Sequence, residues 1–140
     1  MGIMPDANHS HEAAALIALE RAALDRSDQG DAGGFLGLSD EDVTYFDPFL
    51  DRPIRGHEAL REYYAKNFGA EPGTGVMADP HVQLLSEAAV LTFNYAWTNS
   101  RTGVVTRWNA TEVYRRTEAG WRIVHTHWSF VQPLAARSVG

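Results

Sequence analysis

Glu112 is a residue whose type and position could support proton-transfer chemistry. It lies in the middle of a segment with period-two alternation, on the same predicted strand face as Trp108 and Tyr114. A carboxyl group that is partly desolvated among aromatic rings has a raised pKa, and it can then act as a general acid or base near neutral pH. A structural acid that pairs with Arg107 or Arg122 is the alternative interpretation.

Asp47 offers a second carboxylate. It ends a predicted strand over residues 42–46, on the same side as Tyr45, and Pro48 stops that strand. A strand end is a good place for a reactive carboxylate, although Asp-Pro is also a common turn-capping sequence. If Asp47 and Glu112 share one aromatic cavity, one acid can abstract a proton while the other donates one.

His125 and His127 form a His-x-His pair on one face of the last predicted strand, with Cα atoms roughly 6.5–7 Å apart. Such a pair can bind a metal ion if a third ligand converges on it. The alternation places the pair opposite Thr126 and Trp128, on the outer face, so we interpret it as two interface histidines and predict no metal. If the two faces were exchanged, His127 would be the general base and Glu112 an interface residue.

Aromatic residues make up 11% of the chain, which is more than a small core usually needs. Their concentration on one set of strand faces predicts a pocket for a flat, largely apolar or aromatic metabolite. Tyrosine hydroxyls in such a pocket could hydrogen-bond to an enolate-like oxygen. The predicted substrate-binding residues are Tyr45, Phe49, Tyr64, Phe68, Phe93, Tyr95, Trp97, Trp108 and Trp128.

The composition restricts the class of protein. The chain has 140 residues, of which 44% are hydrophobic and 21% are charged, as in a single globular domain. Its formal net charge of −6 argues against binding to nucleic acids or anionic membranes, because both need basic patches. The sequence has no cysteine, no secretory signal pattern and no phosphate-binding glycine motif. We therefore expect a cytoplasmic protein without a cofactor.

The elements that position these residues fall into two blocks. The first half has helical periodicity, which predicts a helix over 13–28 with Ser10 as its N-cap and a second helix over 57–68. A glycine-rich loop over 69–75 follows. The period then changes to two, and hairpin-type breaks occur at 99–103 and 117–120. Four strands are predicted, over 76–86, 89–98, 104–116 and 121–132.

Helices followed by an antiparallel meander predict an α+β fold with the helices on one face of the sheet. One domain is expected over 12–132, between a flexible N-terminal tail (1–11) and a C-terminal tail (133–140). The opposite faces of the two middle strands carry small, uncharged side chains, which predicts a homodimer through the outer face of the sheet. These residues are Val90, Thr92, Asn94, Ala96, Asn109, Thr111 and Val113.

Three segments resemble the nuclear transport factor 2-like superfamily, and in particular its SnoaL-like, ketosteroid isomerase-like branch. They are Tyr-Phe-Asp-Pro at 45–48, Trp-Asn-Ala-Thr-Glu-Val-Tyr at 108–114, and the segment 121–129 that contains Val-His-Thr-His-Trp. The chain is also similar to the association domain of calcium/calmodulin-dependent kinase II. That second resemblance rests on Phe-Asp-Pro at 46–48, Asp-Pro-His-Val-Gln at 79–83 and Val-His-Thr-His at 124–127.

The resemblance implies a cone-shaped barrel made of a strongly curved, mostly antiparallel sheet, with the N-terminal helices packed on its concave face. For function it implies a cofactor-independent isomerase, cyclase or lyase that uses Asp47 and Glu112 as acid and base, or else a non-catalytic association or ligand-binding module. The arginines that line the kinase association domain's cleft correspond here to Tyr95, Glu112 and Trp128. An acidic ligand like that of the kinase domain is therefore not expected.

Overall fold

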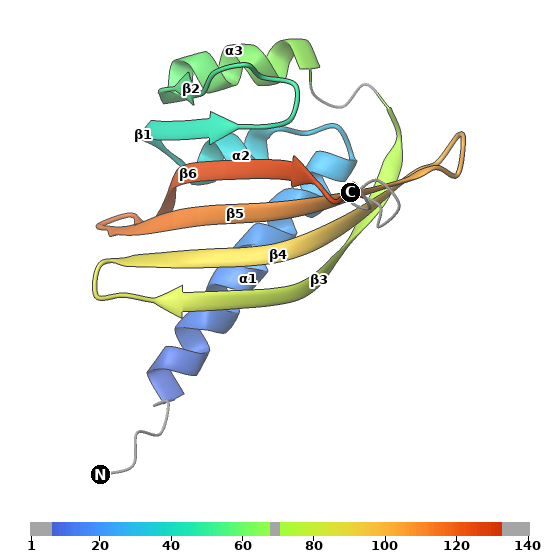
Figure 1. Ribbon diagram of the computed structural model, residues 1–140. Helices are drawn as coiled ribbons and strands as arrows, with labels where there is room; N and C mark the ends of the chain where they lie inside the picture. Colours follow the sequence, from blue (N-terminus) through green and yellow to red (C-terminus); the bar gives the residue numbers. More distant parts are fainter. Residues whose placement is uncertain (1–6, 68–70, 133–140) are drawn as a thin grey trace, which may run out of the picture.

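The structure, a computed structural model, describes residues 7–67 and 71–132 and has an α+β architecture (Figure 1). Helices and short strands come first: α1 (Ala7–Asp28), α2 (Gly33–Leu38), β1 (Ser39–Phe46), β2 (Ile54–Arg55) and α3 (His57–Asn67). A meander of four long strands follows: β3 (Gly73–Leu84), β4 (Ala88–Asn99), β5 (Val105–Thr117) and β6 (Gly120–Phe130). In the described ranges, no helix combines the length and the apolar character needed to cross a membrane. The predicted fold class is confirmed.

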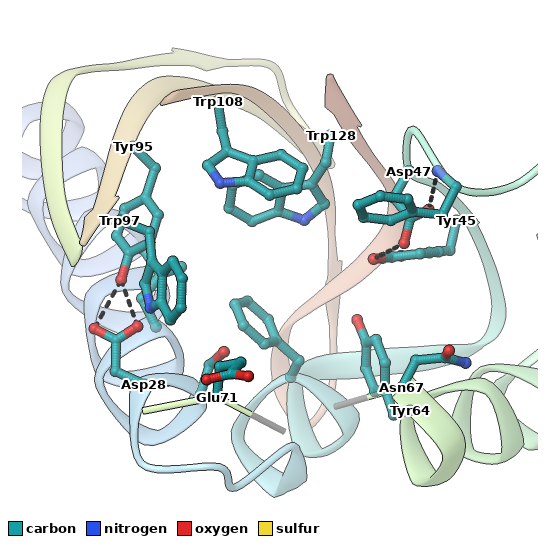
Figure 2. A pocket seen from close by; sticks show the side chains of 14 residues that line it. Asp28, Tyr45, Asp47, Tyr64, Asn67, Glu71, Tyr95, Trp97, Trp108 and Trp128 are labelled. Carbon is teal, nitrogen blue, oxygen red and sulfur yellow. Dashed lines mark hydrogen bonds between the residues drawn. The ribbon is translucent and has the colours of Figure 1, made fainter. Parts of the chain in front are cut away.

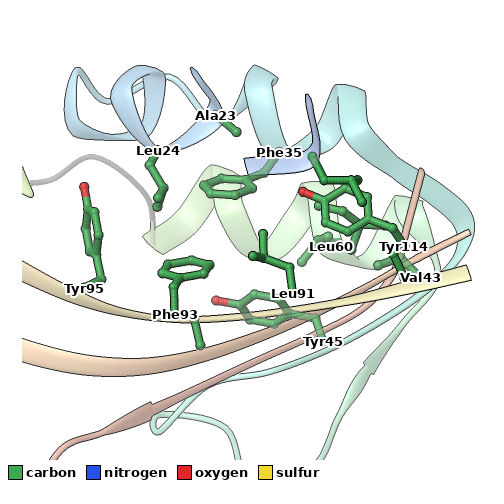
Figure 3. Packing of buried hydrophobic residues seen from close by; sticks show 14 of the residues in the cluster. Ala23, Leu24, Phe35, Val43, Tyr45, Leu60, Leu91, Phe93, Tyr95 and Tyr114 are labelled. Carbon is green, nitrogen blue, oxygen red and sulfur yellow. The ribbon is translucent and has the colours of Figure 1, made fainter. Parts of the chain in front are cut away.

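All six strands belong to one curled, unclosed sheet with the order β2-β1-β6-β5-β4-β3. Every pairing is antiparallel except that between β1 and β6, which is parallel. The helices cover one face: α1 packs against β3 and α2, and α3 packs against β1 and β2. The hydrophobic core lies in this layer, where helix residues such as Leu24 and Leu60 meet strand residues such as Leu91 and Phe93 (Figure 3).

The two predicted hairpins form because their turn residues supply the hydrogen bonds and the backbone angles. Asn99 accepts hydrogen bonds from the backbone N–H groups of Arg101 and Thr102, and Gly103 has φ = 74°. At the other end of β5, the Thr117 hydroxyl donates to the Gly120 carbonyl, and Gly120 has φ = 101°. Glycine adopts these positive φ angles without a steric penalty, so both turns could be predicted from local sequence.

The predicted alternation of β6 is wrong at its start, because a β-bulge interrupts the strand. Tyr114 pairs with Ile123, whereas the preceding Val113 pairs with His125, so Val124 is an extra residue. Ile123 is consequently buried on the same face as Thr126, rather than lying on the outer face with His125. The remainder of β6 keeps the predicted facing.

The boundaries at two other places differ from the predictions. Helix α1 begins at Ala7, three residues before the predicted cap Ser10, so its first turn falls within the expected tail. Strand β3 begins at Gly73, inside the expected loop, and Gly75 pairs with Trp97. The predicted C-terminal tail (133–140) lies outside the described residues.

Glycine is required at Gly73 and Gly75 because aromatic rings lie directly over their backbone. A Cβ atom at Gly73 would overlap the Trp97 indole, and one at Gly75 would overlap the Tyr95 phenol ring. The ring of Tyr95 cannot move away freely, since its hydroxyl is hydrogen-bonded to Asp28. These two glycines therefore set the positions of Tyr95 and Trp97 on the concave face.

We predict that Gly75→Ala lowers the free energy of unfolding by about 1–3 kcal/mol, because the new methyl group must displace the Tyr95 ring from Asp28. Chemical denaturation would measure the loss. Gly37→Ala is the matched control, since no atom lies within 4 Å of a Cβ built at that helical glycine. Equal stability of the Gly75→Ala and wild-type proteins would contradict the packing described for Tyr95.

Candidate active site

A cavity of about 450 Å³ opens between the concave face of the sheet, the end of α1, α2 and the end of α3 (Figure 2). This volume is in the range of small-molecule sites. Its described wall residues are Leu24, Ser27, Asp28, Phe35, Tyr45, Asp47, Phe49, Tyr64, Asn67, Glu71, Tyr95, Trp97, Trp108 and Trp128.

Aromatic rings form most of this wall, and they pack against one another. The Trp128 ring meets the rings of Tyr95 and Trp108 edge to face, with centroids 6.1 and 5.7 Å away. Phe93 lies behind Trp128, with a centroid separation of 5.7 Å, and is 4% exposed. Such contacts keep the rings in defined orientations, so the cavity is formed before any ligand binds.

Most of the aromatic residues predicted from the sequence line the cavity. Phe93 does not, because Trp128 covers it, and Phe68 lies outside the described residues. Phe35 and several polar wall residues were not among the residues predicted from the sequence. The predicted residues found in the wall are Tyr45, Phe49, Tyr64, Tyr95, Trp97, Trp108 and Trp128.

Asp47 lies in the cavity wall at the end of β1, as predicted. Its Oδ2 accepts hydrogen bonds from the hydroxyls of Tyr45 (3.0 Å) and Tyr63 (2.6 Å), and its Oδ1 accepts one from the Phe49 backbone N–H (2.9 Å). Burial raises the pKa of both phenols above the usual value for tyrosine, so they remain protonated donors. Asp47 thus caps the turn and also faces the cavity, so the turn-capping role does not exclude a role in the site.

Asp28 is a second wall carboxylate, and it was not predicted from the sequence. It ends α1, and its two oxygens accept hydrogen bonds from the Tyr95 hydroxyl, at 2.9 Å each. Oδ2 also accepts one from the Gly75 N–H, at 2.9 Å. An acidic residue in the last turn of a helix opposes the helix dipole, and this unfavourable placement was the available signal for a role outside the helix.

Glu112 points toward the concave side but does not reach the cavity. It is 0% exposed, and its Oε2 accepts a hydrogen bond from the Thr126 hydroxyl at 2.7 Å. The other buried carboxyl beside it belongs to Glu20 of α1, whose Oε1 accepts one from the Tyr114 hydroxyl at 2.6 Å. Among the other described residues, Glu20 Oε2 and Glu112 Oε1 have no hydrogen-bond partner, and the two carboxyl groups hydrogen-bond to each other.

This arrangement fits neither interpretation of Glu112, as an acid that contacts the substrate or as an acid that pairs with an arginine. A substrate-contacting acid needs access to the cavity, and neither arginine considered as an ion-pair partner faces the carboxyl: Arg122 instead donates to the Gly37 carbonyl. Burial raises the pKa of Glu112 well above its usual value, and the charge of Glu20 raises it further. Burial likewise raises the pKa of Glu20 to about 7. Near neutral pH the two carboxyl groups therefore retain at least one proton between them.

His125 and His127 lie on the outer face of the sheet. His125 Nδ1 is 2.6 Å from the Thr44 hydroxyl, and the exposed His127 ring lies 5.2 Å from the Phe46 ring, between centroids. The exchanged facing, with His127 as a general base in the pocket, is therefore not adopted. In the part of the chain that the structure describes, no three His, Asp or Glu side chains are grouped to hold a metal ion.

The model of the SnoaL-like domain family matches residues 17–133, which is most of the chain. The chain belongs to the SnoaL-like family. Among curated proteins, none matches its sequence.

Several solved structures are similar to this chain. A ketosteroid isomerase candidate from Parabacteroides distasonis is 44% identical, with a TM-score of 0.74 over 85% of this chain and 87% of that one. The association domain of CaMKII from Caenorhabditis elegans is 22% identical, with a TM-score of 0.75 over 89% and 99% of the two chains. An NTF2-like protein of unknown function from Pseudomonas putida is 16% identical, with a TM-score of 0.80 over 94% of each chain. The latter two similarities show the fold alone.

The buried carboxyl pair of Glu20 and Glu112 predicts that the free energy of unfolding falls as the pH rises. Because the pKa of Glu20 is raised from 4.5 to about 7, the folded protein keeps a proton that the unfolded chain has already released between these values. The contribution of this proton to the free energy of unfolding is fully present below about pH 4.5 and is lost as the pH rises through 7. Chemical denaturation should show that the free energy of unfolding decreases by on the order of 3 kcal/mol between pH 5 and about pH 8.

Glu112→Gln should reduce the pH dependence, because it removes the proton that Glu112, whose pKa is also raised by burial, takes up on folding. The amide can still donate to Glu20 and accept from Thr126. At about pH 8 we expect the variant to be more stable than the wild type. Glu118→Gln, at an exposed turn position, is the matched control and should keep the wild-type profile. Identical pH profiles for Glu112→Gln and wild type would contradict the shared proton.

Proposed function

We propose that this SnoaL-like protein catalyses cofactor-independent proton transfer on a small apolar or aromatic molecule, as an isomerase, cyclase or lyase. The observation that supports this most directly is the Asp47 carboxylate, fixed by Tyr45 and Tyr63 in the wall of an aromatic cavity of about 450 Å³. Its two tyrosine partners hold the carboxylate in one orientation, which is what a general base requires.

In the proposed reaction, Asp47 accepts a proton from a carbon next to a carbonyl group. The C–H bond breaks, and its electron pair moves to the carbonyl oxygen to form an enolate. Three of the roughly four lone-pair positions of Asp47 accept donors from the described residues, so Oδ1 can take one more proton. Phenol and indole groups of the wall are the available donors for the enolate oxygen.

The fate of the enolate decides the reaction class. Return of the proton from Asp47 to another carbon gives isomerisation, loss of a leaving group gives elimination, and attack on a carbonyl of the same molecule gives cyclisation. In elimination the leaving group departs with its bonding electron pair and takes the proton from Asp47, and in cyclisation the newly formed alkoxide takes it. Each outcome therefore regenerates the Asp47 carboxylate and needs no oxidant or reductant. The sealed position of Glu112 means that Asp47 acts without it.

We predict that the protein accelerates the exchange of α-protons of 2-tetralone in D₂O, followed by NMR, and that Asp47→Asn lowers this rate by at least about 100-fold. The amide still accepts the Phe49 N–H but cannot take up a proton. Asp51→Asn removes the same charge from a side chain that is 90% exposed, and it should leave the rate unchanged. Exchange at the wild-type rate in folded Asp47→Asn would refute the assignment.

The second candidate function is a non-catalytic ligand-binding or association module. The observation that favours it is the structural similarity to the CaMKII association domain, which covers 99% of that chain. This candidate predicts binding of small aromatic molecules in the cavity without any acceleration of proton exchange. The same NMR experiment therefore separates the two functions.

We further propose that the protein forms a homodimer through the outer face of the sheet. Asn94 donates to Asn109 (2.8 Å), and Asn109 donates to Ser129 (3.4 Å), which makes a neutral polar row across β4, β5 and β6. The exposed side chains of Val76 and Val105 flank this row on the same face. Arg107, which pairs with Ala96, is also exposed on this face, between Val105 and Asn109. The uncharged row and the valines beside it are suited to burial against a second copy.

Native mass spectrometry of the wild-type protein should then report a dimer. Asn109→Lys should shift the population to monomer, because a two-fold interface would bring two lysines together without counter-charges. Ser100→Lys, in the exposed turn between β4 and β5, adds the same charge away from the face and should remain dimeric. A monomeric wild-type protein would disprove the proposed interface.

A further inference from the structure

We propose that the ligand of the cavity is a cation: an organic amine, protonated at neutral pH, with an aromatic or apolar body. This inference rests on the proposed function only in using the same cavity as the binding site. It adds the charge of the ligand, which neither the fold nor the family determines.

The charges around the cavity have one sign. Three carboxylates line it, from Asp28, Asp47 and Glu71, and no lysine, arginine or histidine is found among the described wall residues. Arg101 approaches Glu71 at 3.4 Å, but these side chains are 68% and 51% exposed, so water screens the pair. The two aspartates have no such basic partner in the described hydrogen bonds.

The aromatic wall is the second, independent observation. The face of an indole or phenol ring attracts a cation, most strongly for tryptophan. Trp97 and Tyr95 lie at the Asp28 end of the cavity, Trp108 and Trp128 lie in the middle, and Asp47 and Tyr45 lie at the other end (Figure 2). A carboxylate next to ring faces is the combination that stabilises a desolvated ammonium group.

Asp28 is the carboxylate that we assign to the ammonium group. The Tyr95 hydroxyl and the Gly75 N–H hold it in place without neutralising it, because both donors are uncharged. When the ammonium group lies beside Asp28, the apolar body of the ligand can extend across Trp108 and Trp128 toward Asp47 (Figure 2). Asp47 then remains available for the proton transfer proposed above.

Other charge classes fit this cavity less well. An anionic ligand would approach the carboxylates of Asp28 and Asp47 without a cationic group in the described wall to compensate it. A metal ion needs converging ligands, and the described carboxylates are not grouped in that way. A neutral hydrocarbon would leave the charge of Asp28 without a counter-ion.

The experiment compares three probes of similar size by isothermal titration calorimetry: 2-phenylethylamine, n-propylbenzene and 3-phenylpropionate. They are a cation, a neutral molecule and an anion at pH 7. We expect the amine to bind at least about tenfold more tightly than the hydrocarbon, and the carboxylate to bind more weakly than both. Equal binding of the amine and the hydrocarbon, a preference for the carboxylate, or no binding of the amine at millimolar concentration would each overturn the proposal.

Asp28→Asn tests the assigned residue. Its amide oxygen can still accept from Tyr95 or Gly75, so the pocket should persist while affinity for the amine falls about tenfold and affinity for the hydrocarbon stays the same. Asp25→Asn is the control, because Asp25 is exposed on the same helix and is not among the described wall residues. Equal losses in the two variants would refute the role of Asp28. If Asp28→Asn does not fold, the ranking of the three probes on the wild type still decides the charge of the ligand.

The binding measurements are independent of turnover. Preference for the amine together with absent proton exchange would overturn the proposed catalysis and support the ligand class. If the α-protons of 2-tetralone exchange in a way that depends on Asp47, while the amine and the hydrocarbon bind equally, the proposed catalysis is supported and the cationic ligand class is overturned.

Discussion

The carboxyl groups of Glu20 in α1 and Glu112 in β5 meet in the buried layer between the helix and the concave face of the sheet. Burial raises the pKa of both groups, and two ionised carboxylates there would repel each other and oppose the packing of α1 on the sheet. Asp28 lies eight residues further along the same helix, about 12 Å away. The position that Glu20 takes in the core therefore determines where Asp28 meets Tyr95 and the cavity.

The concave face is thereby divided into a closed part and an open part. Where α1 and α2 cover the sheet, side chains such as Leu91 and Tyr114 are buried, and the Tyr114 hydroxyl donates to Glu20 of α1. Beyond the end of α1, the same strands carry Tyr95, Trp97 and Trp108, which no helix covers completely and which form walls of the cavity. One sheet face thus supplies both the core and the site.

Membership in the SnoaL-like family explains the scaffold but leaves the chemistry to the individual wall residues, because one fold can carry unrelated activities. In this chain the wall combines acidic side chains with aromatic ring faces. The acids differ in their surroundings: Asp47 is held by two phenols, Asp28 by one phenol and a backbone N–H, and Glu71 is paired at the surface. These differences are the basis for assigning them different roles.

The features that depend on neighbouring residues could be predicted from the sequence. Period-two alternation placed the aromatic residues of β4 and β5 on one face, Asn99–Gly103 and Thr117–Gly120 predicted their turns, and Pro48 placed Asp47 at a strand end. How deeply each residue is buried on its face depends on the helices that pack there, and the strand pattern carries no information about them. Glu112 and Trp108 share a face of β5, yet α1 seals one and leaves the other at the cavity.

The same limit applies to partners that are distant in the sequence. The apolar stripe of α1 includes Glu20, and this misplaced charge could have indicated a buried acid, but nothing local identifies a glutamate 92 residues later as its neighbour. The bulge at Val124 and the strand through Gly73 and Gly75 likewise follow from contacts across the sheet, where backbone pairing and ring packing outweigh local propensity.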